Sequence, residues 1–185
     1  MCGCQNPPSS GDVRMFRNQQ RGSVLLSGVL VVVLSAAPAA SQQRGAPAAP
    51  PGPTAEQAMA ALHSAQETAE ELGVSLSCAV VDSRGDLIAL ARMDGARFYT
   101  TDVARGKARI SALFGQPSGD MADFGSSPAF QSFNETLSGP LYPFQGALPI
   151  MRGDDVIGAM GCSGAASQVD EDAVRAALAV FGDSR

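Results

Sequence analysis

The chain has 185 residues, of which 45% are hydrophobic and 17% charged, a composition that supports a packed core and excludes wholesale disorder. Its formal net charge of -5, with no basic run after Arg44, excludes a nucleic-acid partner, because phosphate binding needs clustered Lys and Arg. Trp is absent and aromatic residues make up 5%, which leaves little surface for stacking on bases or sugars.

Residues 1–41 have the layout of a leader with a secretory signal peptide. A short arginine-containing stretch precedes an apolar run at 24–34, and small alanines follow it. The run is shorter than the roughly 20 residues that span a bilayer. We therefore expect cleavage after Ala39 or Ser41, a secreted or periplasmic protein, and no stable membrane insertion after cleavage. An uncleaved anchor is the alternative, and a natural start at Met15 would shorten the leader.

Residues 42–53 are rich in Ala, Pro and Gly and predict a flexible linker, which leaves a domain at 54–182. Thr54 with Gln57 three residues later is typical of a helix N-terminus. Apolar residues then recur at helical spacing until Gly73, where a C-terminal cap belongs.

The following segments predict two strands, at 75–82 and 87–92, joined by a tight turn. A helix is expected over 101–114, capped by Thr100 or Thr101 and ended by glycine. The segment 116–145 is dense in Gly, Ser and Pro, with short helical turns around Met121 and Phe130, and such long segments are often functional.

Two more strands, at 147–152 and 156–162, precede a last helix that starts at 167–172. The resulting order, α-β-β-α-loop-β-β-α, predicts an α+β fold with an antiparallel sheet flanked by helices.

The sequence lacks the usual catalytic and phosphate-binding motifs. A single His, His63, is expected on a helix surface, and one His with two distant domain cysteines does not supply a standard zinc ligand set, so no metal site is predicted. The three glycines Gly158, Gly161 and Gly164 predict a close approach to a strand, either by a ligand or by a packed helix.

Lys107 is the most informative polar residue. It shares a helical stripe with Val103 and Ile110, so its stem packs on the core with the ammonium in water, or its side chain faces a pocket. We predict that it is at least half buried and that it reaches Asp94, another carboxylate or a cleft.

Four segments carry a resemblance to a known family. They read AEELGVSLSCAVVDSRGDLIALARMDGA, DVARGKARISALFG, GALPIMRGDDVIGAMGCSGA and QVDEDAVRAAL. In this order they resemble the GlcG/HbpS-like family, described as haem-binding or haem-degrading proteins. The resemblance covers 56–181 and implies a profilin-like fold, frequent oligomerisation and, in some secreted members, tetrapyrrole binding.

The resemblance places a haem or related small-molecule site near a group of cationic, polar and sulfur-containing side chains: Arg92, Met93, Asp94, Thr100, Thr101 and Lys107. Cationic groups would pair with the haem propionates, and iron ligation by Met93, His63 or a hydroxyl stays open. The alternatives are an enzyme that uses Lys107 and Asp94 for acid–base chemistry on an unknown small molecule, or a ligand-free oligomeric interaction module.

Four positions depart from the family pattern. Ile110 stands where the family often has Thr, so an oxygen ligand for iron at this position is less well supported. Ala147 stands where the family commonly has a second glycine. Cys78 and Cys162 replace aliphatic residues on strands that a profilin-like sheet makes neighbours. They form either a disulfide or two buried thiols, and we favour thiols because neighbouring strands need not match in register.

Overall fold

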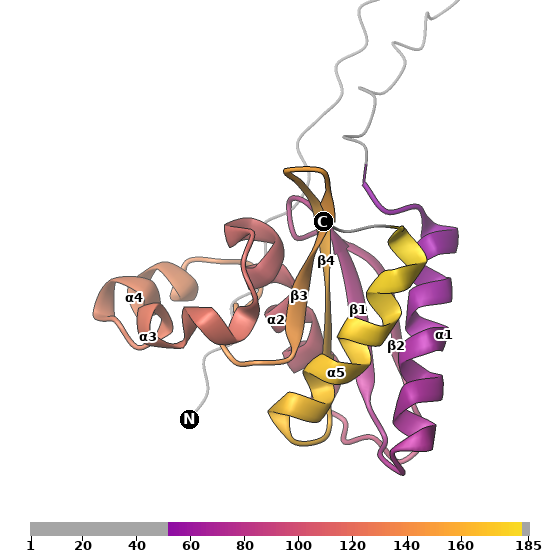
Figure 1. The fold of residues 1–185 in the computed structure, drawn as a ribbon. Coiled ribbons are helices and arrows are strands. Elements are labelled where there is room, and N and C mark those ends of the chain that lie inside the picture. Colours follow the sequence, from indigo (N-terminus) through magenta and orange to yellow (C-terminus); the bar gives the residue numbers. More distant parts are fainter. Residues whose placement is uncertain (1–51, 183–185) are drawn as a thin grey trace, which may run out of the picture. The chain divides into compact units, whose positions relative to one another are not determined.

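The computed structural model describes residues 52–182, so the predicted leader and nearly all of the predicted linker lie outside the described residues (Figure 1). Four strands form one antiparallel sheet in the order β2-β1-β4-β3. The strands are β1 (Ser77–Asp82), β2 (Leu87–Arg92), β3 (Ala147–Arg152) and β4 (Asp155–Ser163). The predicted α+β class with a helix-flanked antiparallel sheet is confirmed.

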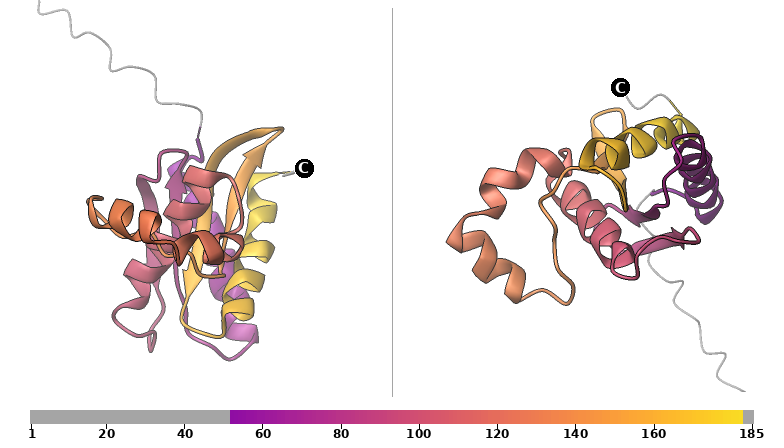
Figure 2. Two further views of the ribbon diagram at one scale, coloured as in Figure 1. Left: turned by 90° about the vertical axis from the view of Figure 1, so that its left-hand side faces the viewer. Right: turned by 90° about the horizontal axis from the view of Figure 1, so that it is seen from below.

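Helices cover both faces of this sheet, as the two views of Figure 2 show. The long helices are α1 (Ala55–Glu71), α2 (Thr100–Phe114) and α5 (Ser167–Ala177). Shorter helical segments are η1 (Ser118–Met121), α3 (Ala122–Gly125), α4 (Pro128–Glu135) and η2 (Leu178–Phe181). Helices α1 and α5 pack together on one face, and α2 packs on the other.

Two of the predicted helix ends are confirmed and one predicted cap is wrong. Thr54 and Gln57 form the predicted capping box of α1, and Gly115 ends α2 in the left-handed conformation. The prediction that Thr100 or Thr101 caps α2 is wrong, since Tyr99 holds that position without a side-chain cap. The Thr100 hydroxyl instead bonds to Arg97 O and to Ser77 Oγ.

The face of the sheet under α1 and α5 carries the main hydrophobic core. Leu62 of α1, Val80 of β1, Ile150 of β3 and Met160 of β4 are almost fully buried there, with Val174 of α5. Full burial of each such side chain contributes about 1.5–3 kcal/mol. This core fixes the position of α5 against β4.

The opposite face carries mostly small residues, which let α2 approach the strands closely. Ala79, Ala159 and Gly161 face α2, and a Cβ at Gly161 would lie only 2.7 Å from Ala104 O and 2.8 Å from Ala108 N. At Gly161 the close approach is therefore made by a packed helix, the second of the two interpretations of the glycines.

Cys78 and Cys162 lie directly opposite each other on β1 and β4 and form a disulfide, with Cα atoms 4.1 Å apart. The favoured expectation of two unpaired thiols is wrong, because the register does place the two residues face to face. The crosslink joins positions 84 residues apart in the two central strands.

Residues 116–145 follow α2, form a helical lobe at one side of the domain and lead into β3 (Figure 1). Phe130 and Met121 bury against Ile110 of α2, and the Tyr142 ring packs on Gly106, where a Cβ would lie 2.2 Å from a ring carbon. The predicted helical turns around Met121 and Phe130 are confirmed.

Candidate functional site

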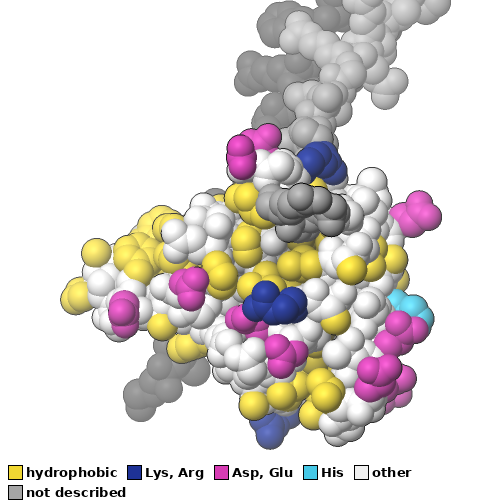
Figure 3. Space-filling model, viewed as in Figure 1, with side chains coloured by type: hydrophobic (Ala, Val, Ile, Leu, Met, Phe, Trp, Pro, Cys, Tyr) yellow, Lys and Arg dark blue, Asp and Glu magenta, His cyan; other side chains and the backbone are white. Residues whose placement is uncertain are grey.

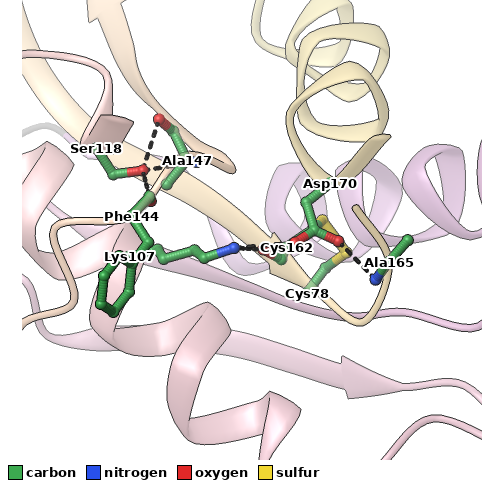
Figure 4. Close-up of polar contacts among 8 residues, drawn as sticks. All are labelled: Cys78, Lys107, Ser118, Phe144, Ala147, Cys162, Ala165 and Asp170. Atoms are coloured by element: carbon green, nitrogen blue, oxygen red, sulfur yellow. Dashed lines mark hydrogen bonds and ion pairs between the residues drawn. A yellow bond between two sulfur atoms is a disulfide. The ribbon is translucent and has the colours of Figure 1, made fainter. Parts of the chain in front are cut away.

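A buried ion pair links the two faces of the domain (Figure 4). The Lys107 Nζ lies 2.9 Å from Asp170 Oδ2 and donates to Cys162 O at 3.1 Å. Lys107 is 3% exposed and Asp170 2% exposed. The prediction that Lys107 is at least half buried and reaches a carboxylate is confirmed, but the partner is Asp170 rather than Asp94.

Asp170 is held as firmly as Lys107. Its other carboxylate oxygen, Oδ1, accepts the Ala165 N–H at 3.0 Å. Burial raises the pKa of Asp170 above its ordinary value, while the hydrogen bond and charge of Lys107 act in the opposite direction. The Lys107 ammonium therefore offsets part of the cost of keeping the buried Asp170 carboxylate ionised.

Gly146 provides the space for this pair. Its φ is +127°, and a Cβ there would lie 2.7 Å from Lys107 Nζ, 2.9 Å from Asp170 Cβ and 3.0 Å from Cys162 O. Any side chain at this position displaces the ammonium or the strand. The glycine that precedes β3 thus belongs to the site.

An open hollow of about 230 Å³, which we call the Lys107 cleft, lies above the ion pair. It is bounded by the start of α2, the end of β4 and the start of α5. Its lining combines the buried pair with apolar, aromatic and cationic side chains: Arg97, Tyr99, Thr100, Val103, Lys107, Phe144, Ser163, Gly164, Ala165, Ser167 and Asp170.

Phe144 reaches this cleft because Ser118 fixes the end of the helical lobe (Figure 4). The Ser118 hydroxyl donates to Phe144 O at 2.6 Å and accepts from Ala147 N at 3.0 Å. Ser118 is itself fully buried, whereas the Phe144 ring is 57% exposed. The lobe therefore delivers an exposed aromatic ring to the rim of the cleft.

A second, apolar groove of about 390 Å³ lies on the other side of Phe144 and runs between α3, α4 and residues 141–144. Figure 3 shows hydrophobic side chains gathered at the surface of this lobe, and Phe124 and Phe133 are 43% and 46% exposed. Phe144 lines both hollows.

The predicted site residues do not form one site. Arg92, Met93 and Asp94 line a separate polar hollow of about 380 Å³ with Gln66 and Glu70, and this hollow shares no lining residue with the Lys107 cleft. The enzyme alternative, which joined Lys107 to Asp94, therefore loses its geometric basis.

Several atoms of the predicted site residues are already hydrogen bonded within the domain. The Met93 sulfur accepts the Leu76 N–H at 3.3 Å, and the Asp94 carbonyl accepts from Ser75 Oγ at 3.0 Å. Thr100 is buried with its hydroxyl bonded twice, and the Thr101 hydroxyl donates to Phe98 O at 3.2 Å. Of the six residues, Thr100 and Lys107 line the cleft.

Nine residues of the cleft were not predicted as site residues, and four of them bear most on its chemistry: Arg97, Tyr99, Phe144 and Asp170. Asp170 stands in the first turn of an expected helix, where an acidic residue is ordinary. Arg97 and Tyr99 lie in an irregular segment. The one sequence feature that indicates a role for them is their position directly before the helix that carries Lys107. Phe144 has no local signal.

The conventional metal ligands lie elsewhere in the described domain. His63 is on the exposed side of α1, 3.3 Å from Glu67, as expected for a surface residue. Between residues 52 and 182, no three His, Cys, Asp or Glu side chains lie close enough together to hold a metal ion. In the same range, no helix has the length and hydropathy needed to cross a membrane.

These features define a class: a small α+β domain with an antiparallel sheet and an open cleft above a buried Lys–Asp pair. The chain belongs to the HbpS-like family, because the family model described as "Haem degrading protein HbpS-like" matches residues 54–179. The resemblance seen in the sequence is thereby confirmed.

Relatives from three organisms support this assignment. The double mutant of Streptomyces reticuli HbpS is 30% identical, with a TM-score of 0.64 over 80% of this chain and 99% of that one. Klebsiella pneumoniae ORFY is 26% identical, with a TM-score of 0.63 over 71% and 92% of the two chains. An uncharacterized 15.0 kDa protein of Citrobacter freundii is 28% identical over 115 residues, which make up 61% of this chain and 80% of the relative.

Proposed function

We propose that the chain is an exported haem-binding protein and that the Lys107 cleft holds one edge of the haem. The observation that carries this proposal is the composition of the cleft in a member of a family described as haem degrading. Apolar side chains (Tyr99, Val103, Phe144) stand beside one cation, Arg97, whose charge no carboxylate neutralises in a described ion pair. A tetrapyrrole with carboxylate substituents needs both kinds of group.

Arg97 rather than Lys107 is the residue that we assign to the propionates. The Lys107 ammonium already has Asp170 and a carbonyl as partners, so its positive charge is balanced within the domain. Arg97 is exposed at the cleft rim. Lys107 and Asp170 then act as positioning residues that hold β4, α2 and α5 together beneath the ligand.

The size of the cleft bears on how haem would bind. Pockets that enclose most of a drug-sized ligand hold about 300–1,000 Å³, and the cleft holds about 230 Å³. One copy of the chain therefore covers only part of a macrocycle and leaves the rest open. When bound, haem supplies the iron chemistry, and the residues of the chain bind and orient it.

Haem titration of the full chain tests the proposal, with the Soret band as readout. We expect saturable binding, and at least about tenfold weaker affinity for Arg97→Ala, since one charge-assisted hydrogen bond contributes 1.5–3 kcal/mol. Arg152→Ala, at the end of β3, is the matched control and should bind as the parent does. Arg92→Ala tests the other hollow: a loss there but not with Arg97→Ala would place the site at Arg92. A parent chain without a saturable Soret change would refute haem binding.

Export is a separate part of the proposal and rests on the sequence of residues 1–41. We expect mass spectrometry of protein recovered outside the cytoplasm to give an N-terminus between Ala40 and Gln43. Full-length protein retained in the membrane would contradict this part and would leave haem binding by the domain untouched.

A further inference from the structure

We propose that Tyr99, supported by Arg97, is the residue that ligates the haem iron. This inference rests on the proposed function, because it assigns a ligand within the same cleft. It starts from the chemistry of the side chains that reach the cleft. Protein ligands of haem iron are His, Cys, Met and Tyr, and Tyr99 is the one member of this set among the residues that line the Lys107 cleft.

The other polar groups of the cleft are already committed. Lys107 and Asp170 bind each other at 2.9 Å. The Thr100 hydroxyl lies 2.7 Å from Ser77 Oγ and donates to Arg97 O at 2.6 Å, and Thr100 is only 1% exposed. None of these three reaches an iron atom without losing a buried partner, which is costly.

The stronger haem ligands of the described domain lie in other places. His63 is on the exposed side of α1 beside Glu67, and the Met93 sulfur accepts the Leu76 N–H in the other hollow. Cys78 and Cys162 are joined to each other. Position 110, where the family often has Thr, is an isoleucine packed against the helical lobe and supplies no oxygen.

The geometry around Tyr99 suits a charged ligand. Arg97 Nη1 donates to the Tyr99 hydroxyl oxygen at 3.2 Å, so one guanidinium nitrogen stands beside a phenolate that binds iron, and the other N–H groups of Arg97 are left for a propionate. The backbone between them is held in a turn, because Thr100 N and the Thr100 hydroxyl both donate to Arg97 O. The pair is therefore preset before any ligand arrives.

Tyr99 is also accessible, which an iron ligand must be. Its side chain is 43% exposed and lies at the first turn of α2. The neighbouring Phe98 ring, 81% exposed, packs edge-on against it with centroids 5.5 Å apart. An aromatic ring in this place offers apolar cover beside the iron position.

Binding of ferric haem to the full chain, followed by visible absorption, electron paramagnetic resonance and resonance Raman spectroscopy, tests the assignment. The parent should show a ferric phenolate complex with iron–phenolate vibrations. Tyr99→Phe should lose these vibrations and at least tenfold in affinity, with unchanged circular dichroism because only an exposed hydroxyl is removed. Tyr142→Phe is the matched control, as Tyr142 is the second of two tyrosines in the chain and does not line the Lys107 cleft, and the substitution keeps the ring that stacks on Phe144.

Arg97→Lys adds an independent readout. It keeps a cation but loses the planar donor, so we expect haem to stay bound with shifted iron–phenolate vibrations. If Tyr99→Phe binds haem with the parent spectrum, or if Tyr142→Phe is the variant that loses the phenolate signal, the inference is refuted and the proposed function stands. If the parent itself does not bind haem, both are refuted.

Discussion

Replacing Lys107 by methionine isolates the charge of the buried pair. Methionine matches the length of the stem but leaves the Asp170 carboxylate with backbone partners alone, the N–H groups of Ala165 and Gly164. Breaking one side of a buried ion pair costs about 3–5 kcal/mol. We therefore expect Lys107→Met to lose that much free energy of unfolding at pH 7 in urea denaturation of the full chain with its disulfide intact.

The loss should depend on pH in a definite direction. Burial already raises the pKa of Asp170, and removal of Lys107, the main opposing influence, raises it further. Between the ordinary aspartate pKa of about 3.9 and this raised value, the folded chain binds more protons than the unfolded chain, so stability falls as pH rises through the interval. The deficit of Lys107→Met should therefore be smaller at pH 4.5 than at pH 7.

The double variant Lys107→Met with Asp170→Asn provides the control. Asparagine can still accept the Ala165 N–H, and no charge remains buried, so most of the lost stability should return. A single variant within about 1 kcal/mol of the parent at pH 7, or a double variant no more stable than the single one, would refute the role that we assign to the pair.

Three further predictions concern the frame of the site and the leader. Gly146→Ala should cost at least about 2 kcal/mol more than Gly153→Ala, because both glycines have positive φ but only the first faces Lys107 Nζ at 2.7 Å; equal losses in urea denaturation would contradict this. Peptide mapping of denatured, unreduced chain should find Cys78 and Cys162 in one crosslinked species, and reduction should cost about 4–5 kcal/mol for a loop of 84 residues; free thiols at both positions would exclude the bond. Leader cleavage predicts that secreted chains lack residues 1–39, and N-terminal sequencing that begins at Met15 would contradict it.

The sequence was sufficient for most of the fold because its signals are local. The capping box at Thr54, the strand pair around residues 83–86 and the left-handed Gly115 each depend on neighbours within a few positions. The predicted cap of α2 is wrong because the Thr100 hydroxyl is bonded elsewhere, to Arg97 O three residues before it and to Ser77 Oγ, 23 residues away.

The candidate site was only partly predictable, again because of distance along the chain. The place of Lys107 on an apolar stripe was enough to predict its burial. Its partner Asp170 is 63 residues away and is set by how α5 packs on β4. The register that brings Cys78 opposite Cys162 depends on β1–β4 pairing, and Phe144 reaches the cleft through Ser118, so none of these contacts has a local signature.

Lys107 is also the one lysine among the 185 residues, and it is buried and paired. The described domain consequently presents no exposed lysine amine to acylating reagents while it is folded. A dye or an affinity handle that reacts with amines therefore leaves the cleft unmodified. Acylation of Lys107 then reports that the domain has opened around its buried cation.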